Sequence, residues 1–85
     1  MKVKTRDWNE IYTEYFITTS RGNEINCILP KGAIITGARV KGKKAIIDVD
    51  SGWLKPQYRQ AVQYEMPINK RVLFECWPNG DYYFV

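Results

Sequence analysis

Histidine is absent from this 85-residue sequence, and cysteine occurs only twice. Without histidine the chain lacks the commonest general base and the commonest metal ligand. The two cysteines, Cys27 and Cys76, fall short of the four ligands, or three ligands and a water, that bind zinc. Phosphate-binding loops and dinucleotide fingerprints are missing too. We therefore expect a protein that binds rather than catalyses, with no cofactor and no metal.

Long apolar runs are also missing. No stretch approaches the 18 consecutive apolar residues of a transmembrane helix, and the charged segment from Met1 to Arg6 is unlike a cleavable signal peptide. We expect a cytoplasmic protein with no membrane contact. In a reducing compartment both cysteines are expected to stay thiols and to pack as small hydrophobes, a single bridge between them being the alternative.

Aromatic residues, by contrast, are plentiful, with three Trp, six Tyr and three Phe. A chain of this length buries only about 60–65% of its unfolded surface, so large side chains are needed to build its core. No linker, repeat or low-complexity tract interrupts the sequence. Residues 1–85 are therefore expected to form one domain.

Apolar and polar residues alternate between Gly-, Pro- and Asn-containing turns, which predicts an all-β, mainly antiparallel fold. We expect six to seven short strands arranged as a meander, barrel or sandwich. Asp7 to Glu10 resembles a capping box, so at most one short helical turn is expected near the N-terminus. The strands are predicted over residues 11–19, 25–29, 34–41, 45–49, 60–66, 71–77 and 82–85, with Ile34, Thr36, Ala38 and Val40 on one face of the third.

The net charge of +4 is unevenly distributed. A hairpin is predicted around Gly42, and its basic residues should project together from one strand and its turn. Such a ridge can neutralise phosphates and release counterions. The alternative is a solubilising turn whose lysines protect a strand edge from unwanted pairing. The residues of this basic hairpin are Arg39, Lys41, Lys43 and Lys44.

The loop that follows interleaves aromatic and basic residues, namely Trp53, Lys55, Tyr58 and Arg59. An aromatic ring beside a cation can stack on a base while the cation pairs with its phosphate. In the alternative, Trp53 folds back and covers the open end of a small barrel. The nucleic-acid interpretation requires this loop and the basic hairpin to meet on one exposed surface.

Asp48 and Asp50 are two residues apart on a predicted strand, so both carboxylates should face the same side. Such a pair could hold a divalent ion. The alternative, which we favour, is that these acids lie at a solvated strand end and pair with nearby lysines.

The order of segments resembles a family of small phage proteins with a Tyr-rich strand, a Leu-Pro-Lys-Gly-Ala junction, a hairpin with an acidic end and an aromatic last strand. The corresponding residues here are Tyr12, Tyr15, Leu29 to Ala33, Ile47 to Asp50, Met66 to Ile68, and Gly80 to Phe84. The family's Trp before the acidic hairpin end and its His in the last strand are absent here. The resemblance implies an all-β fold and a phage-type origin, hence a host cytoplasm, and it assigns no site residues.

Phage proteins of this size are often similar to counter-defence factors, including inhibitors of toxin–antitoxin endoribonucleases. We therefore expect a protein that engages RNA, a host nucleic-acid-handling protein, or both, and inhibits it without catalysis. The alternative is a protein-only inhibitor or a structural accessory protein that acts through an exposed strand edge or an aromatic patch. Self-association into a homo-oligomer is compatible with either hypothesis.

Overall fold

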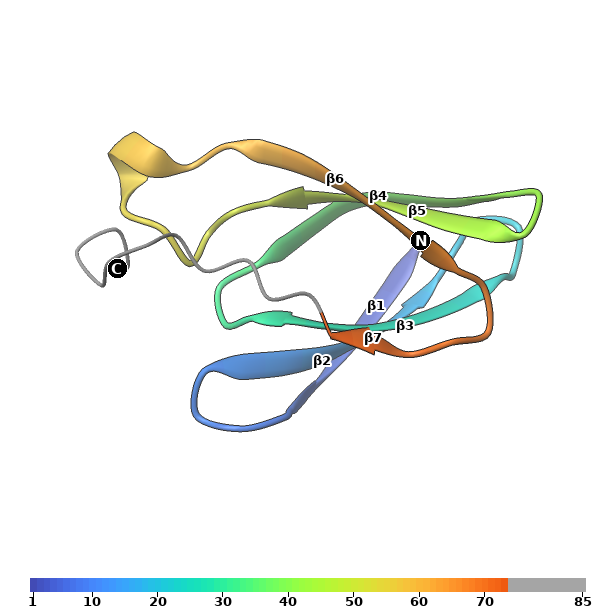
Figure 1. Ribbon diagram of the computed structural model, residues 1–85, viewed down its shortest axis with the longest axis horizontal. Helices are drawn as coiled ribbons and strands as arrows, with labels where there is room; N and C mark the ends of the chain where they lie inside the picture. Colours follow the sequence, from blue (N-terminus) through green and yellow to red (C-terminus); the bar gives the residue numbers. More distant parts are fainter. Residues whose placement is uncertain (74–85) are drawn as a thin grey trace.

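Two β-sheets face each other across a shared core in the computed structural model, which describes residues 1–73 (Figure 1). The first sheet has the strand order β1-β2-β3-β7 and the second has the order β4-β5-β6. Adjacent strands are antiparallel except β3 and β7. The elements are β1 (Lys2–Asp7), β2 (Tyr12–Thr18), β3 (Glu24–Pro30), β4 (Ile34–Lys41), β5 (Lys44–Asp50), the 3-10 turn η1 (Pro56–Tyr58), β6 (Ala61–Pro67) and β7 (Val72–Leu73). The predicted all-β class is confirmed, and of the expected arrangements the sandwich is the one observed.

The core lies between the sheets because alternate residues of each strand point inward. Ile17 of β2, Cys27 of β3 and Ile47 of β5 are each almost or entirely buried. Burial raises the pKa of the Cys27 thiol to about 12, so this cysteine is an unreactive apolar side chain, as expected. Cys76 lies outside the described residues. The buried cluster consists of Tyr15, Ile17, Ile25, Cys27, Leu29, Ala33, Ala45, Ile47, Val49, Trp53, Leu54 and Met66.

The charged N-terminal segment forms a strand that the sequence did not predict. β1 pairs along its length with β2, and every one of its residues is exposed, which explains why it shows no apolar face. The sequence allowed at most one short helical turn near the N-terminus, and the described residues have none there. Instead, the Oδ1 atom of Asn9 accepts hydrogen bonds from the backbone N–H groups of Ile11 and Tyr12, at 2.9 and 2.8 Å, and this turn joins β1 to β2.

The predicted face of β4 is wrong over its first three residues because the strand contains a β-bulge. Ile35 pairs with Val49 and Gly37 pairs with Asp48, so Thr36 is an extra residue that reverses the alternation. As a result Ile35, rather than Ile34, packs against the core together with Ala38 and Val40. Ile34 is 49% exposed.

Five predicted strands, residues 11–19, 25–29, 34–41, 45–49 and 60–66, correspond closely to β2, β3, β4, β5 and β6. Of the strand predicted over residues 71–77, the described part contains β7 at Val72–Leu73. Residues 74–77 and the predicted strand 82–85 lie outside the described residues. None of the helices in residues 1–73 has the length and apolar character needed to cross a membrane.

Candidate nucleic-acid interface

The basic hairpin and the aromatic loop lie at opposite ends of the second sheet (Figure 1, right and left). They are separated by β5, which runs from Lys44 to Asp50 and spans about 20 Å at roughly 3.3 Å per residue. The expectation that both elements share one exposed surface is therefore wrong. The physical reason is that an extended strand places the turns before and after it at opposite ends of its sheet.

Trp53 is buried, with 4% of its surface exposed. The prediction that its ring stacks on a base is wrong. The ring folds back, as in the alternative, but it packs in the core of a two-sheet sandwich and not over the open end of a barrel. Within residues 1–73 its indole N–H has no hydrogen-bond partner. Close backbone packing fixes this loop: a Cβ atom on Gly32, whose φ is +98°, would lie 2.9 Å from the carbonyl oxygen of Gly52.

The other predicted residues of this loop stay near the surface but do not join the basic hairpin. Tyr58 is 39% exposed at the end of η1, and Lys55 is half-buried just before it. The Nε atom of Arg59 donates a hydrogen bond of 3.3 Å to Asp50. These residues belong to the end of the molecule opposite the hairpin tip.

The paired aspartates of β5 are engaged by arginines rather than by lysines. Asp48 accepts hydrogen bonds from Arg39 at 3.3 Å and from Gln63 at 3.0 Å, while Asp50 pairs with Arg59. In the described part of the chain no group of three or more potential ligands could hold a metal ion. The acids therefore serve as ion-pair partners, but of arginines and not of the lysines expected from the sequence.

Three turns meet at the end of the molecule that carries the hairpin tip (Figure 1, right). The backbone N–H of Ile68, after β6, donates a hydrogen bond of 3.1 Å to the carbonyl oxygen of Lys43. The turn after β2 and the last residues of β4 together line a hollow of about 280 Å³, with Arg21, Arg39 and Lys41 among its walls. Both sheets thus contribute to one surface.

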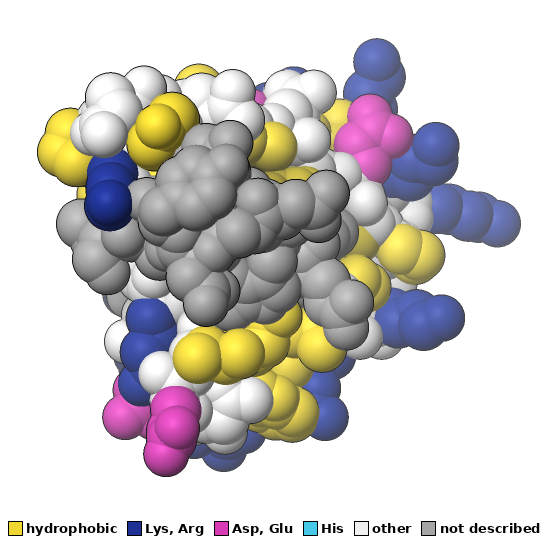
Figure 2. Space-filling model, turned by 60° about the vertical axis from the view of Figure 1, so that its left-hand side comes forward, with side chains coloured by type: hydrophobic (Ala, Val, Ile, Leu, Met, Phe, Trp, Pro, Cys, Tyr) yellow, Lys and Arg dark blue, Asp and Glu magenta, His cyan; other side chains and the backbone are white. Residues whose placement is uncertain are grey.

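Exposed cations gather on this surface, which we call the basic end: Lys2, Arg21, Arg39, Lys41, Lys43, Lys44 and Lys70. Three acids, Glu24, Asp48 and Glu65, lie in the same region, so its formal charge is seven minus three, or +4. Among residues 1–73, Asp7, Glu10 and Asp50 at the opposite end balance Lys31, Lys55 and Arg59. Dark blue side chains accordingly project from the far right of Figure 2.

No known protein family, curated protein or solved structure matches the chain.

Sequence reasoning missed three members of the basic end, Lys2, Arg21 and Lys70. Arg21 lies in the turn after β2 and Lys70 in the turn after β6, while Lys2 is paired with Thr18 beside the first of these turns. A usable signal was present. In a chain of up-and-down strands, alternate turns return to the same end, so the turns after β2, β4 and β6 belong together.

Glu14 is the centre of a second polar cluster, on the outer face of the first sheet. Its side chain is 1% exposed and accepts hydrogen bonds from Arg6, Asn26 and Arg71. Desolvation by burial raises its pKa, but the hydrogen bonds from Asn26, Arg6 and Arg71 outweigh that effect and hold the pKa below its usual 4.5. The carboxylate is therefore ionised and joins three segments of the chain.

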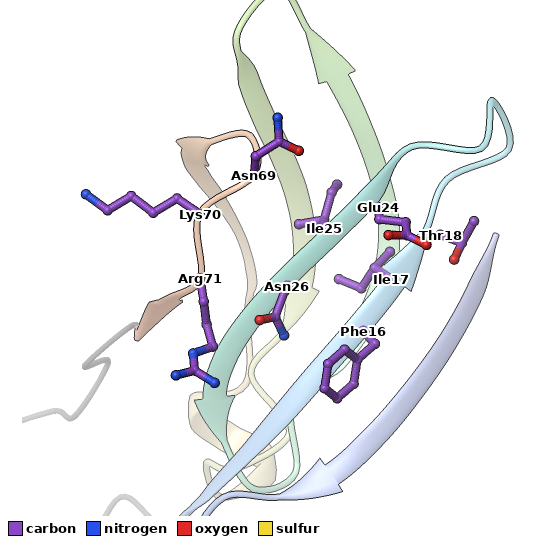
Figure 3. A pocket seen from close by; sticks show the side chains of 9 residues that line it. All are labelled: Phe16, Ile17, Thr18, Glu24, Ile25, Asn26, Asn69, Lys70 and Arg71. Carbon is purple, nitrogen blue, oxygen red and sulfur yellow. The ribbon is translucent and has the colours of Figure 1, made fainter.

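A groove of about 640 Å³ opens beside this cluster, between the outer side of β2 and β3 and the segment Asn69 to Arg71 (Figure 3). Phe16, Asn26 and Arg71 contribute an aromatic ring, an amide and a guanidinium to its walls. Lys70 belongs both to this groove and to the basic end. The groove and the cations therefore form one continuous candidate interface.

Proposed function

We propose that the protein is a non-catalytic binding protein that engages RNA through the basic end. The observation that supports this proposal is the gathering of seven exposed cations from three turns and both sheets at one end, while among residues 1–73 the charges of the other end balance. Such an uneven distribution orients the protein toward a polyanion during encounter. It replaces the hairpin-and-loop surface expected from the sequence.

The cations differ in how readily they can meet a phosphate. Arg39 and Lys44 form exposed ion pairs with Asp48 and Glu65, at 3.3 and 3.8 Å. Exposed pairs contribute only about 0–1 kcal/mol, so replacing these acids by phosphates as ion-pair partners costs little free energy. The other five, Lys2, Arg21, Lys41, Lys43 and Lys70, form no ion pair with any residue in 1–73.

Binding of this kind would act stoichiometrically. By occupying an RNA, or the RNA-bearing surface of a host nucleic-acid-handling enzyme, the protein would block that enzyme without a reaction of its own. A toxin–antitoxin endoribonuclease complex is the kind of target that the resemblance to phage proteins suggests.

The test is a titration of fluorescently labelled single-stranded RNA with the full chain at several salt concentrations, read by anisotropy. We expect affinity to fall steeply with salt, because Lys and Arg release counterions from the phosphates. The double variant Lys43→Glu and Lys44→Glu should weaken binding by roughly tenfold or more. Retained affinity in this variant would overturn the proposal.

A matched control lies at the opposite end. Lys31→Glu with Lys55→Glu makes the same change in net charge but leaves the basic end intact. We expect its affinity to fall much less than that of the hairpin variant. Equal losses in the two variants would show that net charge, rather than this surface, governs binding.

The competing proposal is a protein-directed inhibitor that uses an exposed strand edge. The observation that favours it is β1, an edge strand whose six residues are all exposed, followed by exposed Trp8 and Ile11. Basic residues at alternate positions of β1, however, oppose edge-to-edge pairing. A stoichiometric complex captured from bacterial lysate that survives nuclease and moderate salt would favour this competing proposal over RNA binding.

A further inference from the structure

The groove beside the Glu14 cluster has the size and the chemistry of a ligand site. Its volume of about 640 Å³ falls within the range of roughly 300–1,000 Å³ that is typical of small-ligand pockets. Two of its lining residues, Ile17 and Ile25, belong to the core between the sheets. Its aromatic and polar walls, Phe16, Asn26 and Arg71, do not belong to that core cluster, so packing of the core does not explain them.

Phe16 supplies an aromatic surface. It is 38% exposed on the outer side of β2, whereas its neighbours Tyr15 and Ile17 point inward and are buried. The guanidinium of Arg6 lies 5.5 Å from the centroid of the ring, which holds the ring in place through a cation–π contact. A fixed and partly exposed ring is suited to stacking against a planar ligand.

Asn26 supplies a fixed acceptor. Its Nδ2 atom donates to Glu14 Oε2 at 3.0 Å and to the carbonyl oxygen of Tyr15 at 3.1 Å. Because both amide hydrogens are used inside the protein, the group that it can offer to a ligand is its carbonyl oxygen. In Figure 3 the Asn26 amide lies between the Arg71 guanidinium and the Phe16 ring.

Arg71 and Glu24 add donors and a further acceptor. A guanidinium carries five N–H donors, and Arg71 directs one of its nitrogens at Glu14. Glu24 places a carboxylate on the same groove, which disfavours a phosphate there. The aromatic ring matches the flat face of a nucleobase. The hydrogen-bond donors and acceptors of the groove match the polar edge of the base.

We infer that this groove receives one unstacked nucleobase of the RNA strand whose phosphates lie on the basic end. The inference rests on the proposed function and adds that the protein prefers single-stranded RNA, because bases inside a duplex are stacked and their edges are paired. Lys70, on the rim of the groove, is placed to meet the phosphate next to that base.

The experiment compares two single strands of equal length and phosphate number, one carrying its bases and one entirely abasic, together with an RNA duplex. Each is titrated with the full chain by anisotropy. We expect the base-carrying strand to bind roughly five- to 150-fold more tightly than the abasic one, since one base stacks on Phe16. Phe16→Ala should remove that difference while leaving the affinity for the abasic strand unchanged.

Two further variants keep the outcome interpretable. Phe16→Leu retains an apolar side chain without a π-face and should behave like Phe16→Ala, whereas Tyr58→Ala, at the opposite end, should preserve the difference. Loss of affinity for the abasic strand in the Phe16 variants would show a structural role and overturn the inference. Equal affinity of the wild-type protein for both strands would overturn it too and leave the proposed function standing. Absence of salt-dependent binding to either strand would refute the proposed function itself.

Discussion

Arg71 donates a hydrogen bond of 3.3 Å to Glu14, which lies 57 positions earlier in the chain. The same guanidinium lies 4.7 Å from the centroid of the Trp8 ring. This pair of contacts holds the segment before β7 against the outer face of the first sheet. Because that segment forms one wall of the groove, the Glu14 cluster shapes the candidate interface as well as stabilising the fold.

Glu14→Gln should destabilise the protein near neutral pH, because Arg6 and Arg71 lose the negative charge between them. The pKa of Glu14 is lowered by folding, so its contribution is fully present above the unperturbed 4.5 and is lost as pH falls through the lower folded value. The difference in stability between wild type and variant should therefore shrink as the solution is acidified below about pH 4.5. Urea unfolding at a series of pH values measures this difference.

Asp7→Asn is the matched control for that experiment. The Asp7 side chain is 87% exposed and pairs with Lys31 at 3.2 Å, as surface ion pairs commonly do. We expect a loss of no more than about 1 kcal/mol at neutral pH. A loss in Asp7→Asn equal to that of Glu14→Gln would contradict the special role given to Glu14.

Arg21→Gln tests the turn that sequence reasoning overlooked. Arg21 lines the hollow with Arg39 and Lys41, so its removal should weaken RNA binding. The slope of log affinity against log salt should fall by roughly 0.7 for each phosphate contact that is lost. Arg21→Lys keeps the charge and should keep most of the slope. An unchanged slope in Arg21→Gln would place Arg21 outside the interface.

Trp53→Phe should leave RNA affinity unchanged, because the ring lies in the core and cannot stack on a base. The substitution also removes an indole N–H that has no partner in residues 1–73, so we expect a stability change below about 1.5 kcal/mol. Trp53→Ala should cost about 3–5 kcal/mol. These values are measured by chemical denaturation alongside the RNA titration. Loss of affinity in a stably folded Trp53→Phe protein would contradict the buried position.

The bulge in β4 can be tested with two neighbouring isoleucines. Ile35→Ala should destabilise by roughly 1 kcal/mol or more, because Ile35 packs on the core. Ile34→Ala should change stability by no more than about 0.5 kcal/mol, because Ile34 is largely exposed. A larger loss of stability in Ile34→Ala than in Ile35→Ala would contradict the bulge and support the uninterrupted alternation expected from the sequence. Urea midpoints of the two variants decide between these registers.

Local patterns in the sequence identified most of the strands, but they missed β1 and assigned the wrong face to the start of β4. Alternation located β2, β3 and β5 because one face of each is buried. It failed for β1, where no residue is buried, and at Thr36, where one extra residue reverses the pattern. Neither failure involves a residue that is unusual in strands, so the β-propensity of the residues could not have indicated it.

The candidate site was harder to predict because it depends on which segments meet. Arg39, Lys41, Lys43 and Lys44 were identified from local charge, and they do lie together on the surface. The companion loop was wrongly placed, because closeness in sequence was taken for closeness in space. The groove was not foreseen, since Phe16 and Arg71 are brought together only by tertiary structure.

The parallel pairing of β3 with β7 has a consequence for synthesis on the ribosome. Cys27 is paired with Val72, so the second edge of β3 remains without this partner until nearly all of the described chain has been made. Until then the nascent chain carries an open strand edge, and Glu14 lacks its hydrogen bond from Arg71. A ribosome that stalls before Arg71 would leave a product prone to aggregation and to degradation by proteases.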